Sequence, residues 1–119
     1  MTMPMATCLS IVIPVYNAAA TIGPLVDQLV TELAPQYALD IVLVHDCSPG
    51  AGTEEACLAA YRRHPRLVKF YSLAKNVGEH NAVMAGLRHT TGAYVVIMDD
   101  DFQNPIAEVA KLVDRKSVV

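Results

Sequence analysis

The sequence of 119 residues lacks the features that mark several common protein classes. No apolar run approaches the roughly 20 residues of a membrane-spanning helix, and the segment from Met1 to Ser10 lacks the charged and apolar regions of a secretion signal. The net charge of -3 gives no broad basic field for nonspecific binding to nucleic acid or to an anionic membrane. We therefore expect a soluble, cytoplasmic chain with no nucleic-acid partner, in which any recognition of phosphate is local.

Cofactor and disulfide motifs are also missing. The 3 cysteines are odd in number and form no Cys-x-x-Cys pair, which fits a reduced compartment and excludes the usual zinc spacings. Residues 14–20 read Pro-Val-Tyr-Asn-Ala-Ala-Ala where a dinucleotide-binding domain would carry Gly-x-Gly-x-x-Gly, and no P-loop motif is present. The 4 histidines show no metal-ligand spacing, so we expect them to be structural or exposed.

What the sequence has is a strong alternation of apolar runs and helical patterns. A hydrophobic content of 53% with 18% charged residues predicts a single domain with a packed core. Short runs rich in β-branched residues predict four buried strands at Ser10–Val15, Asp40–His45, Leu67–Leu73 and Tyr94–Met98. Helices are expected from Thr21, a possible N-cap, to before Pro35, from Thr53 to before Pro65, from Asn76–Gly78 to Arg88, and from near Pro105.

Four successive strand-helix units are typical of an α/β fold with a parallel sheet and right-handed crossovers. In such folds ligands bind beyond the carboxyl ends of the strands. Polar residues follow each predicted strand, so all four groups should meet at one edge of the sheet: Tyr16 and Asn17, Asp46 and Ser48, Lys75 and Asn76, and Asp99 to Asp101.

The acidic triplet Asp99 to Asp101 directly follows the last predicted strand. Its charge predicts a hard divalent cation, Mg²⁺ or Mn²⁺, whose coordination a substrate diphosphate completes. The alternative is a solvated acidic turn that caps the next helix through Asp101 or Asn104. The position at the end of a strand favours the metal site.

The other strand ends each allow two interpretations. Asp46 either accepts a hydrogen bond from a base or a ribose, or closes an Asx turn with Ser48. Tyr16 either lies along a base ring or packs against the strand end. Lys75 either meets phosphate oxygens where the third helix begins or is only exposed.

Three segments resemble, in order and spacing, the family 2 glycosyltransferases with a GT-A fold: residues 11–17 (Ile-Val-Ile-Pro-Val-Tyr-Asn), 44–48 (Val-His-Asp-Cys-Ser) and 98–105 (Met-Asp-Asp-Asp-Phe-Gln-Asn-Pro). Within that family, the Asn76-x-Gly78 turn that leads into Ala82, Ala85 and Gly86, followed by Asp-x-Asp-x-Gln-x-Pro, is most similar to the enzymes that transfer a sugar from a nucleotide to a polyprenyl phosphate. Dolichol-phosphate mannose synthases and undecaprenyl-phosphate sugar transferases are of this type.

The resemblance implies a Rossmann-like, three-layer GT-A sandwich with a mostly parallel sheet, truncated after the fourth βα unit. Residues 1–119 would be the N-terminal, nucleotide-sugar-binding part of the domain. The activity implied is a metal-dependent transfer, of the hexosyltransferase type, from a UDP- or GDP-sugar with inversion, and a polyprenyl phosphate is the implied acceptor.

The resemblance also implies roles for individual residues. Pro14, Tyr16 and Asn17 would line the base and ribose, Asp46 would bond the base, and Asp99 would contact the nucleotide. Asp101 would be the ligand of the Mg²⁺ or Mn²⁺ ion, with Gln103 beside it.

Two departures from the family pattern concern donor binding: His45 replaces a common aspartate, and Ala18 replaces a common glutamate. The family's domain is also about twice as long, so we expect the acceptor side, the catalytic residues and any membrane helices to lie beyond Val119, with the longer protein at the cytoplasmic face of the membrane. The alternative is a noncatalytic nucleotide-binding or assembly module that pairs with another chain or a second copy.

Overall fold

A four-stranded parallel sheet lies at the centre of the molecule, in a computed structural model that describes residues 7–49, 52–101 and 109. The strands are β1 (Cys8–Val15), β2 (Ala38–His45), β3 (Val68–Ser72) and β4 (Tyr94–Ile97). They lie in the order β3-β2-β1-β4, and each neighbouring pair is parallel. The two central strands, β1 and β2, are apolar along most of their length because helices cover both of their faces.

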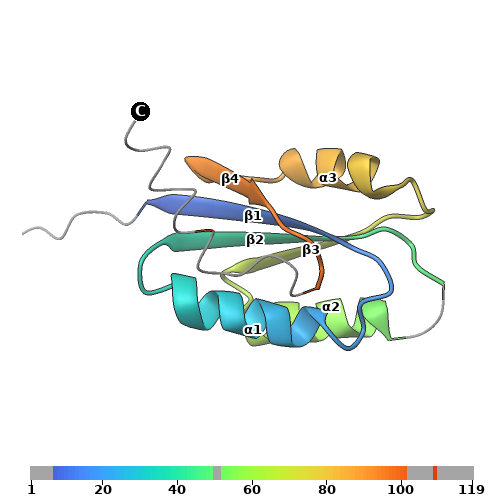
Figure 1. The fold of residues 1–119 in the computed structure, drawn as a ribbon, viewed down its shortest axis with the longest axis horizontal. Helices are drawn as coiled ribbons and strands as arrows, with labels where there is room; N and C mark the ends of the chain where they lie inside the picture. The colour runs from blue at the N-terminus through green and yellow to red at the C-terminus, as the bar shows by residue number, and fades with distance from the viewer. Residues whose placement is uncertain (1–6, 50–51, 102–108, 110–119) are drawn as a thin grey trace, which may run out of the picture.

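Three helices complete a three-layer sandwich (Figure 1). Helices α1 (Ile22–Leu33) and α2 (Thr53–Arg63) lie side by side on one face, and α3 (Glu79–Leu87) covers the other. Leu9, Ile11 and Ile13 of β1 face α1 and α2, while Val12 belongs to a smaller cluster with Ala82 of α3. Within the described ranges, no helix is both long and apolar enough to cross a membrane.

The direction of winding reverses between β1 and β4. The chain moves outward from β1 to β2 and β3 through α1 and α2, then returns through α3 on the opposite face to place β4 on the other side of β1. In open α/β sheets, the loops on either side of such a reversal diverge and leave a crevice at the carboxyl ends of the strands. The crevice between β1 and β4 is therefore the place where this topology favours a ligand.

The predicted elements agree with the structure to within one or two residues at their ends, which confirms the α/β prediction. Thr21 stands at the predicted N-cap position of α1, but its hydroxyl caps no backbone N–H of that helix. The hydroxyl donates to the carbonyl oxygen of Asp100 at 3.0 Å, so Thr21 is the N-cap residue, as predicted, without a capping bond from its side chain. The predicted start of a fourth helix, near Pro105, lies outside the described residues.

A buried polar cluster holds the opposite edge of the sheet, at the amino ends of the strands. Asp40 of β2 accepts hydrogen bonds from the hydroxyl of Ser10 at 2.7 Å and from the amide of Thr91 at 2.9 Å, and it pairs with the ammonium of Lys69 at 2.9 Å. Burial alone would raise the pKa of Asp40, but the hydrogen bonds from Ser10, Lys69 and Thr91 outweigh it and lower the pKa. The cluster ties the loop between α3 and β4 to the two central strands.

Candidate functional site

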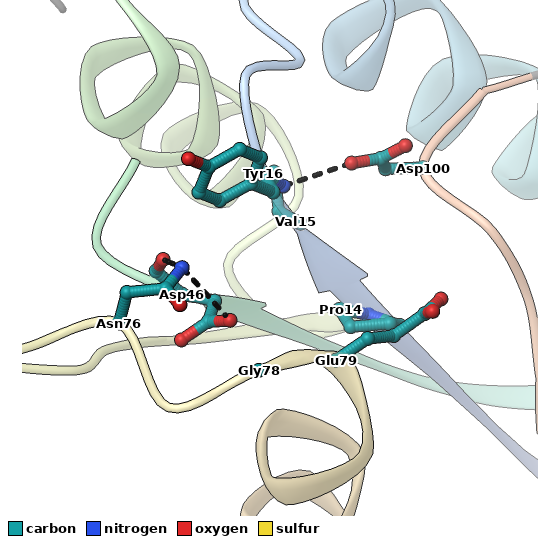
Figure 2. Close-up of a pocket in the computed structure, with 8 residues that line it drawn as sticks. All are labelled: Pro14, Val15, Tyr16, Asp46, Asn76, Gly78, Glu79 and Asp100. Carbon is teal, nitrogen blue, oxygen red and sulfur yellow. Dashed lines mark hydrogen bonds between the residues drawn. The ribbon is translucent and has the colours of Figure 1, made fainter. Parts of the chain in front are cut away.

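The carboxyl ends of the four strands surround an open cleft of ≈ 450 Å³, a size typical of small-ligand sites. Figure 2 shows its walls, which come from four separate segments of the chain. They are Pro14, Val15 and Tyr16 at the end of β1, Asp46 after β2, Asn76, Gly78 and Glu79 at the start of α3, and Asp100 after β4. The structure therefore brings together residues from four polar groups that lie far apart in the sequence, as expected for the carboxyl ends of parallel strands.

The β1 side of the cleft carries an aromatic ring. Tyr16 is the first residue after β1 and remains 45% exposed, with its ring standing beside the cleft (Figure 2). Asn17 follows with a φ of 49°, in the left-handed region that asparagine tolerates, and this turns the chain toward α1. Because the ring is not packed into the core, it offers one face to a planar ligand group.

Asp46 joins two walls of the cleft. It is only 3% exposed, and its Oδ1 accepts the amide N–H of Val77 at 2.8 Å. The side-chain amide of Asn76 donates to Oδ2 of Asp46 at 3.3 Å and to its carbonyl oxygen at 3.0 Å. The carboxylate thus holds the loop before α3 across 31 residues of sequence, and each oxygen keeps a lone pair for a further donor.

The predicted alternative, an Asx turn between Asp46 and Ser48, is wrong because Ser48 pairs with His45. Nε2 of His45 lies 2.7 Å from the hydroxyl of Ser48 and accepts its backbone N–H at 3.2 Å, and Nδ1 lies 3.3 Å from the hydroxyl of Ser72. His45 is buried and is not one of the residues that line the cleft, which agrees with the expected structural role.

The acidic triplet contributes one residue to the wall of the cleft. Asp100, the middle residue, lines the cleft, and its Oδ2 accepts the backbone N–H of Tyr16 at 2.8 Å. Burial raises the pKa of Asp100, the hydrogen bond from Tyr16 opposes that effect, and the charges of Asp101 and Asp99 add to it. Asp99 and Asp101 are partly buried and do not line the cleft.

The other predicted site residues are distributed unevenly. Pro14 and Tyr16 line the cleft, whereas Asn17 and Lys75 are exposed next to segments that do, and Gln103 lies outside the described residues. The prediction omitted Glu79 at the first position of α3. A carboxylate in the first turn of a helix that opens at a strand's carboxyl end is a signal that could have identified it.

The charges of the cleft decide what it can bind. Three of its lining residues, Asp46, Glu79 and Asp100, are acidic, and none is lysine or arginine. In the described part of the chain, no three side chains of histidine, cysteine, aspartate or glutamate lie close enough together to hold a metal ion by themselves. Oxygen ligands suit Mg²⁺ or Mn²⁺, and Mg²⁺ commonly uses only one or two carboxylates with substrate phosphates completing its shell. The donor set therefore fits a cation that binds together with a diphosphate.

Comparison with known sequences finds relatives that match most of this chain. The chain is 38% identical over 108 residues to the undecaprenyl-phosphate 4-deoxy-4-formamido-L-arabinose transferase of Edwardsiella ictaluri, covering 88% of this chain and 32% of that protein. It is 34% identical over 118 residues to the protein of the same name from Klebsiella pneumoniae, covering 97% and 35%. The chain thus spans about a third of the length of the curated relatives that it matches.

Solved structures agree with the sheet and its helices. The mannosyltransferase PcManGT from Pyrobaculum calidifontis, in complex with GDP-Man and Mn²⁺, superposes with a TM-score of 0.72 at 29% identity, over 81% of this chain and 28% of that one. TarS from S. aureus gives a TM-score of 0.68 at 25% identity, over 90% and 19%. These neighbours confirm the predicted GT-A architecture. Because residues 10–117 match the family described as Glycosyl transferase family 2, the chain belongs to that family.

Proposed function

We propose that this chain is the donor-binding part of a metal-dependent glycosyltransferase that takes a sugar from a nucleoside diphosphate sugar with inversion. The observation that carries the proposal is the cleft itself. An exposed ring, Tyr16, and a buried carboxylate, Asp46, flank it at the carboxyl ends of adjacent strands, and the aspartate triplet lies beside it. The similarity to a mannosyltransferase solved with GDP-Man and Mn²⁺ supports the same class of donor.

The walls of the cleft suggest how a nucleoside would bind. The ring of Tyr16 stacks on the base, with Pro14 and Asn17 beside the base and ribose. The remaining lone pairs of Asp46 accept a base N–H or a ribose hydroxyl, because the bonds from Asn76 and Val77 occupy only part of its capacity. Lys75 contacts the phosphate oxygens, and Asp99 also contacts the nucleotide.

Asp101 is the proposed metal ligand, with Gln103 beside it. A bound Mg²⁺ or Mn²⁺ would neutralise the charge that develops on the departing nucleoside diphosphate. The three carboxylates of the cleft are then balanced in part by the cation, which allows an anionic donor to enter.

The proposed acceptor is a polyprenyl phosphate, on the similarity to proteins named as undecaprenyl-phosphate transferases. A phosphate oxygen is already ionised near neutral pH, so attack on the anomeric carbon needs little help from a general base. Since the chain spans about a third of those relatives, we assign it the donor side only and no acceptor residue.

Calorimetric titration of this chain with UDP- and GDP-sugars, with and without Mn²⁺, tests the proposal. Asp101→Asn should abolish the metal dependence, whereas Asp46→Asn should weaken nucleotide binding with the metal still required. Glu54→Gln makes the same acid-to-amide change at an exposed residue of α2 that does not line the cleft, and should bind as wild type does. Absence of metal-dependent binding to either nucleotide refutes the proposal, and identical behaviour of the two aspartate variants refutes the assigned roles.

A noncatalytic assembly module is the second candidate, and the surface of β4 favours it. Val95 and Ile97 are 41% and 53% exposed on this strand, which pairs with β1 on one side and has no other strand partner among the described residues. An unpaired apolar edge promotes association with another chain or a second copy. Light scattering distinguishes the two candidates, because a clean monomer that binds donor argues against the module.

A further inference from the structure

Asp100 makes two contacts that cross the crevice between β4 and β1. Its Oδ2 accepts the N–H of Tyr16 at 2.8 Å, and its carbonyl oxygen accepts the hydroxyl of Thr21 at 3.0 Å. Figure 2 shows the carboxylate turned toward the backbone of Tyr16. One residue therefore holds both ends of the loop between β1 and α1.

The register of the sheet explains why Asp100 reaches this loop. β4 pairs with β1 only from Leu9↔Tyr94 to Val12↔Ile97, while β1 continues to Val15. The next link, from the N–H of Met98 to the carbonyl of Val12 at 3.0 Å, keeps the chain beside β1. Two residues later the carboxylate of Asp100 reaches Tyr16, whose N–H follows the last paired residue of β1 and needs an acceptor.

We propose that Asp100 is a positioning residue, which fixes Tyr16 and the loop to α1 against the aspartate triplet and thereby shapes the donor cleft without binding the metal. The role rests on the proposed donor-binding function. We call these two hydrogen bonds the tether. The tether holds the ring of Tyr16 at a fixed distance from the carboxylates after β4, so donor binding requires less ordering of the loop.

The chemistry of the two roles differs in a way that substitutions can resolve. A tether needs only an acceptor oxygen, which asparagine retains in its side-chain carbonyl. A ligand of Mg²⁺ or Mn²⁺ needs the charge of the carboxylate. Asp100→Asn should therefore keep the hydrogen bond to Tyr16 and most of the donor affinity, and Asp100→Ala should lose that bond and weaken donor binding. The same logic applies to the second contact, where Thr21→Ser keeps the hydroxyl and Thr21→Val removes it.

The experiment measures three quantities in this chain: amide hydrogen exchange at Tyr16 by NMR, the dissociation constant for GDP- and UDP-sugars at saturating Mn²⁺, and Mn²⁺ binding in the presence of nucleotide by electron paramagnetic resonance. For Asp100→Ala we expect about tenfold faster exchange at Tyr16 and about tenfold weaker donor binding, with Mn²⁺ binding kept. Asp100→Asn should lie within about threefold of wild type in each, since it keeps the hydrogen bond. Asp101→Asn should lose Mn²⁺ binding while exchange at Tyr16 stays as in wild type.

Two results overturn the role of Asp100. One is unchanged exchange at Tyr16 in Asp100→Ala, and the other is loss of Mn²⁺ binding in Asp100→Asn, which would make its charge a metal ligand. If Asp100→Ala does not fold, as judged by circular dichroism, the comparison of Asp100→Asn with Asp101→Asn and of Thr21→Val with Thr21→Ser still decides the question. Thr21→Val should weaken donor binding severalfold relative to Thr21→Ser, and equal affinities count against the tether. A wild-type chain that binds no nucleotide refutes the proposed function instead.

Discussion

Replacement of Asp40 by alanine tests how the edge of the sheet opposite the cleft is held. Asp40 is 6% exposed and accepts hydrogen bonds from the hydroxyl of Ser10 and from the backbone N–H and hydroxyl of Thr91, in addition to its ion pair with Lys69. Because these donors come from β1, β3 and the loop before β4, the substitution removes a shared acceptor from three parts of the fold at once.

The expected loss follows from which donors stay buried. A buried donor left without its partner costs about 1–3 kcal/mol, and the hydroxyl of Ser10, which is fully buried, loses the carboxylate. Thr91 is exposed, and its N–H keeps a second acceptor in Oγ of Ser10 at 3.3 Å, so its loss is smaller. The ammonium of Lys69 is partly exposed, so its ion pair adds at most about 1 kcal/mol. We expect Asp40→Ala to lower the free energy of unfolding by about 2–4 kcal/mol.

Urea denaturation followed by circular dichroism measures this difference, with Asp27→Ala as the matched control. Asp27 also pairs with two side chains, Arg63 at 3.1 Å and His64 at 2.9 Å, but its own side chain is about half exposed at 49%. Its loss should cost less than about 1 kcal/mol because solvent screens the pair. If the two variants are equally destabilised, the reasoning from burial and shared acceptors is refuted.

The dependence of this effect on pH has a definite sign. The pKa of Asp40 is lowered in the folded state, so its carboxylate stabilises the fold fully above the ordinary value of 3.8 and loses that contribution as the pH falls through the lower folded-state pKa. The gap in stability between wild type and Asp40→Asn should therefore be constant near neutrality and shrink below about pH 4. A gap that widens on acidification would contradict the assignment.

Two further predictions concern the packing of the sheet faces. A methyl group at Gly86 of α3 would lie 2.7 Å from Cγ1 of Val12, so Gly86→Ala should lower the free energy of unfolding by about 1–3 kcal/mol in urea denaturation. Gly23→Ala on α1 is the control, because the nearest atom is 3.4 Å away, and it should be neutral or stabilising. Equal effects would count against close packing of α3. Burial raises the pKa of the Cys57 thiol to about 12, so iodoacetamide at pH 8 should label exposed Cys47 in the native protein and Cys57 only after unfolding, as read by peptide mass spectrometry.

Most of the fold could be predicted from the sequence because its signals are local. Apolar runs such as Asp40–His45 mark central strands, and the three-and-four spacing of α1 marks its buried face, so both kinds of element were located to within a residue or two. The N-cap residue of α1 was also predicted correctly, but the partner of its side chain was not, because that partner is not local. Thr21 has the residue type and position of an N-cap, and its hydroxyl donates to a carbonyl after the end of β4.

The site was only partly predictable because some of its contacts join residues far apart in the sequence. Pro14, Tyr16 and Asp46 follow strands directly, and the rule that ligands bind at strand ends was enough to select them. That rule does not reveal that the carboxylate of Asp46 also accepts hydrogen bonds from Asn76 and Val77. The bond to Val77 spans 31 residues of sequence, and both bonds depend on how α3 packs against the sheet.

The aspartate triplet shows what decides between chemically identical neighbours. Three successive carboxylates leave β4, and along an extended chain alternate side chains point to opposite sides. Which of them turns into the crevice depends on where β4 stops against β1, and here Ile97 stops opposite Val12, which leaves Asp100 within hydrogen-bond reach of the N–H of Tyr16. A shift of one residue in that register would present Asp99 or Asp101 to the same N–H. The sequence thus predicts a carboxylate at this edge, and the long-range register between two parallel strands determines which one serves as the tether.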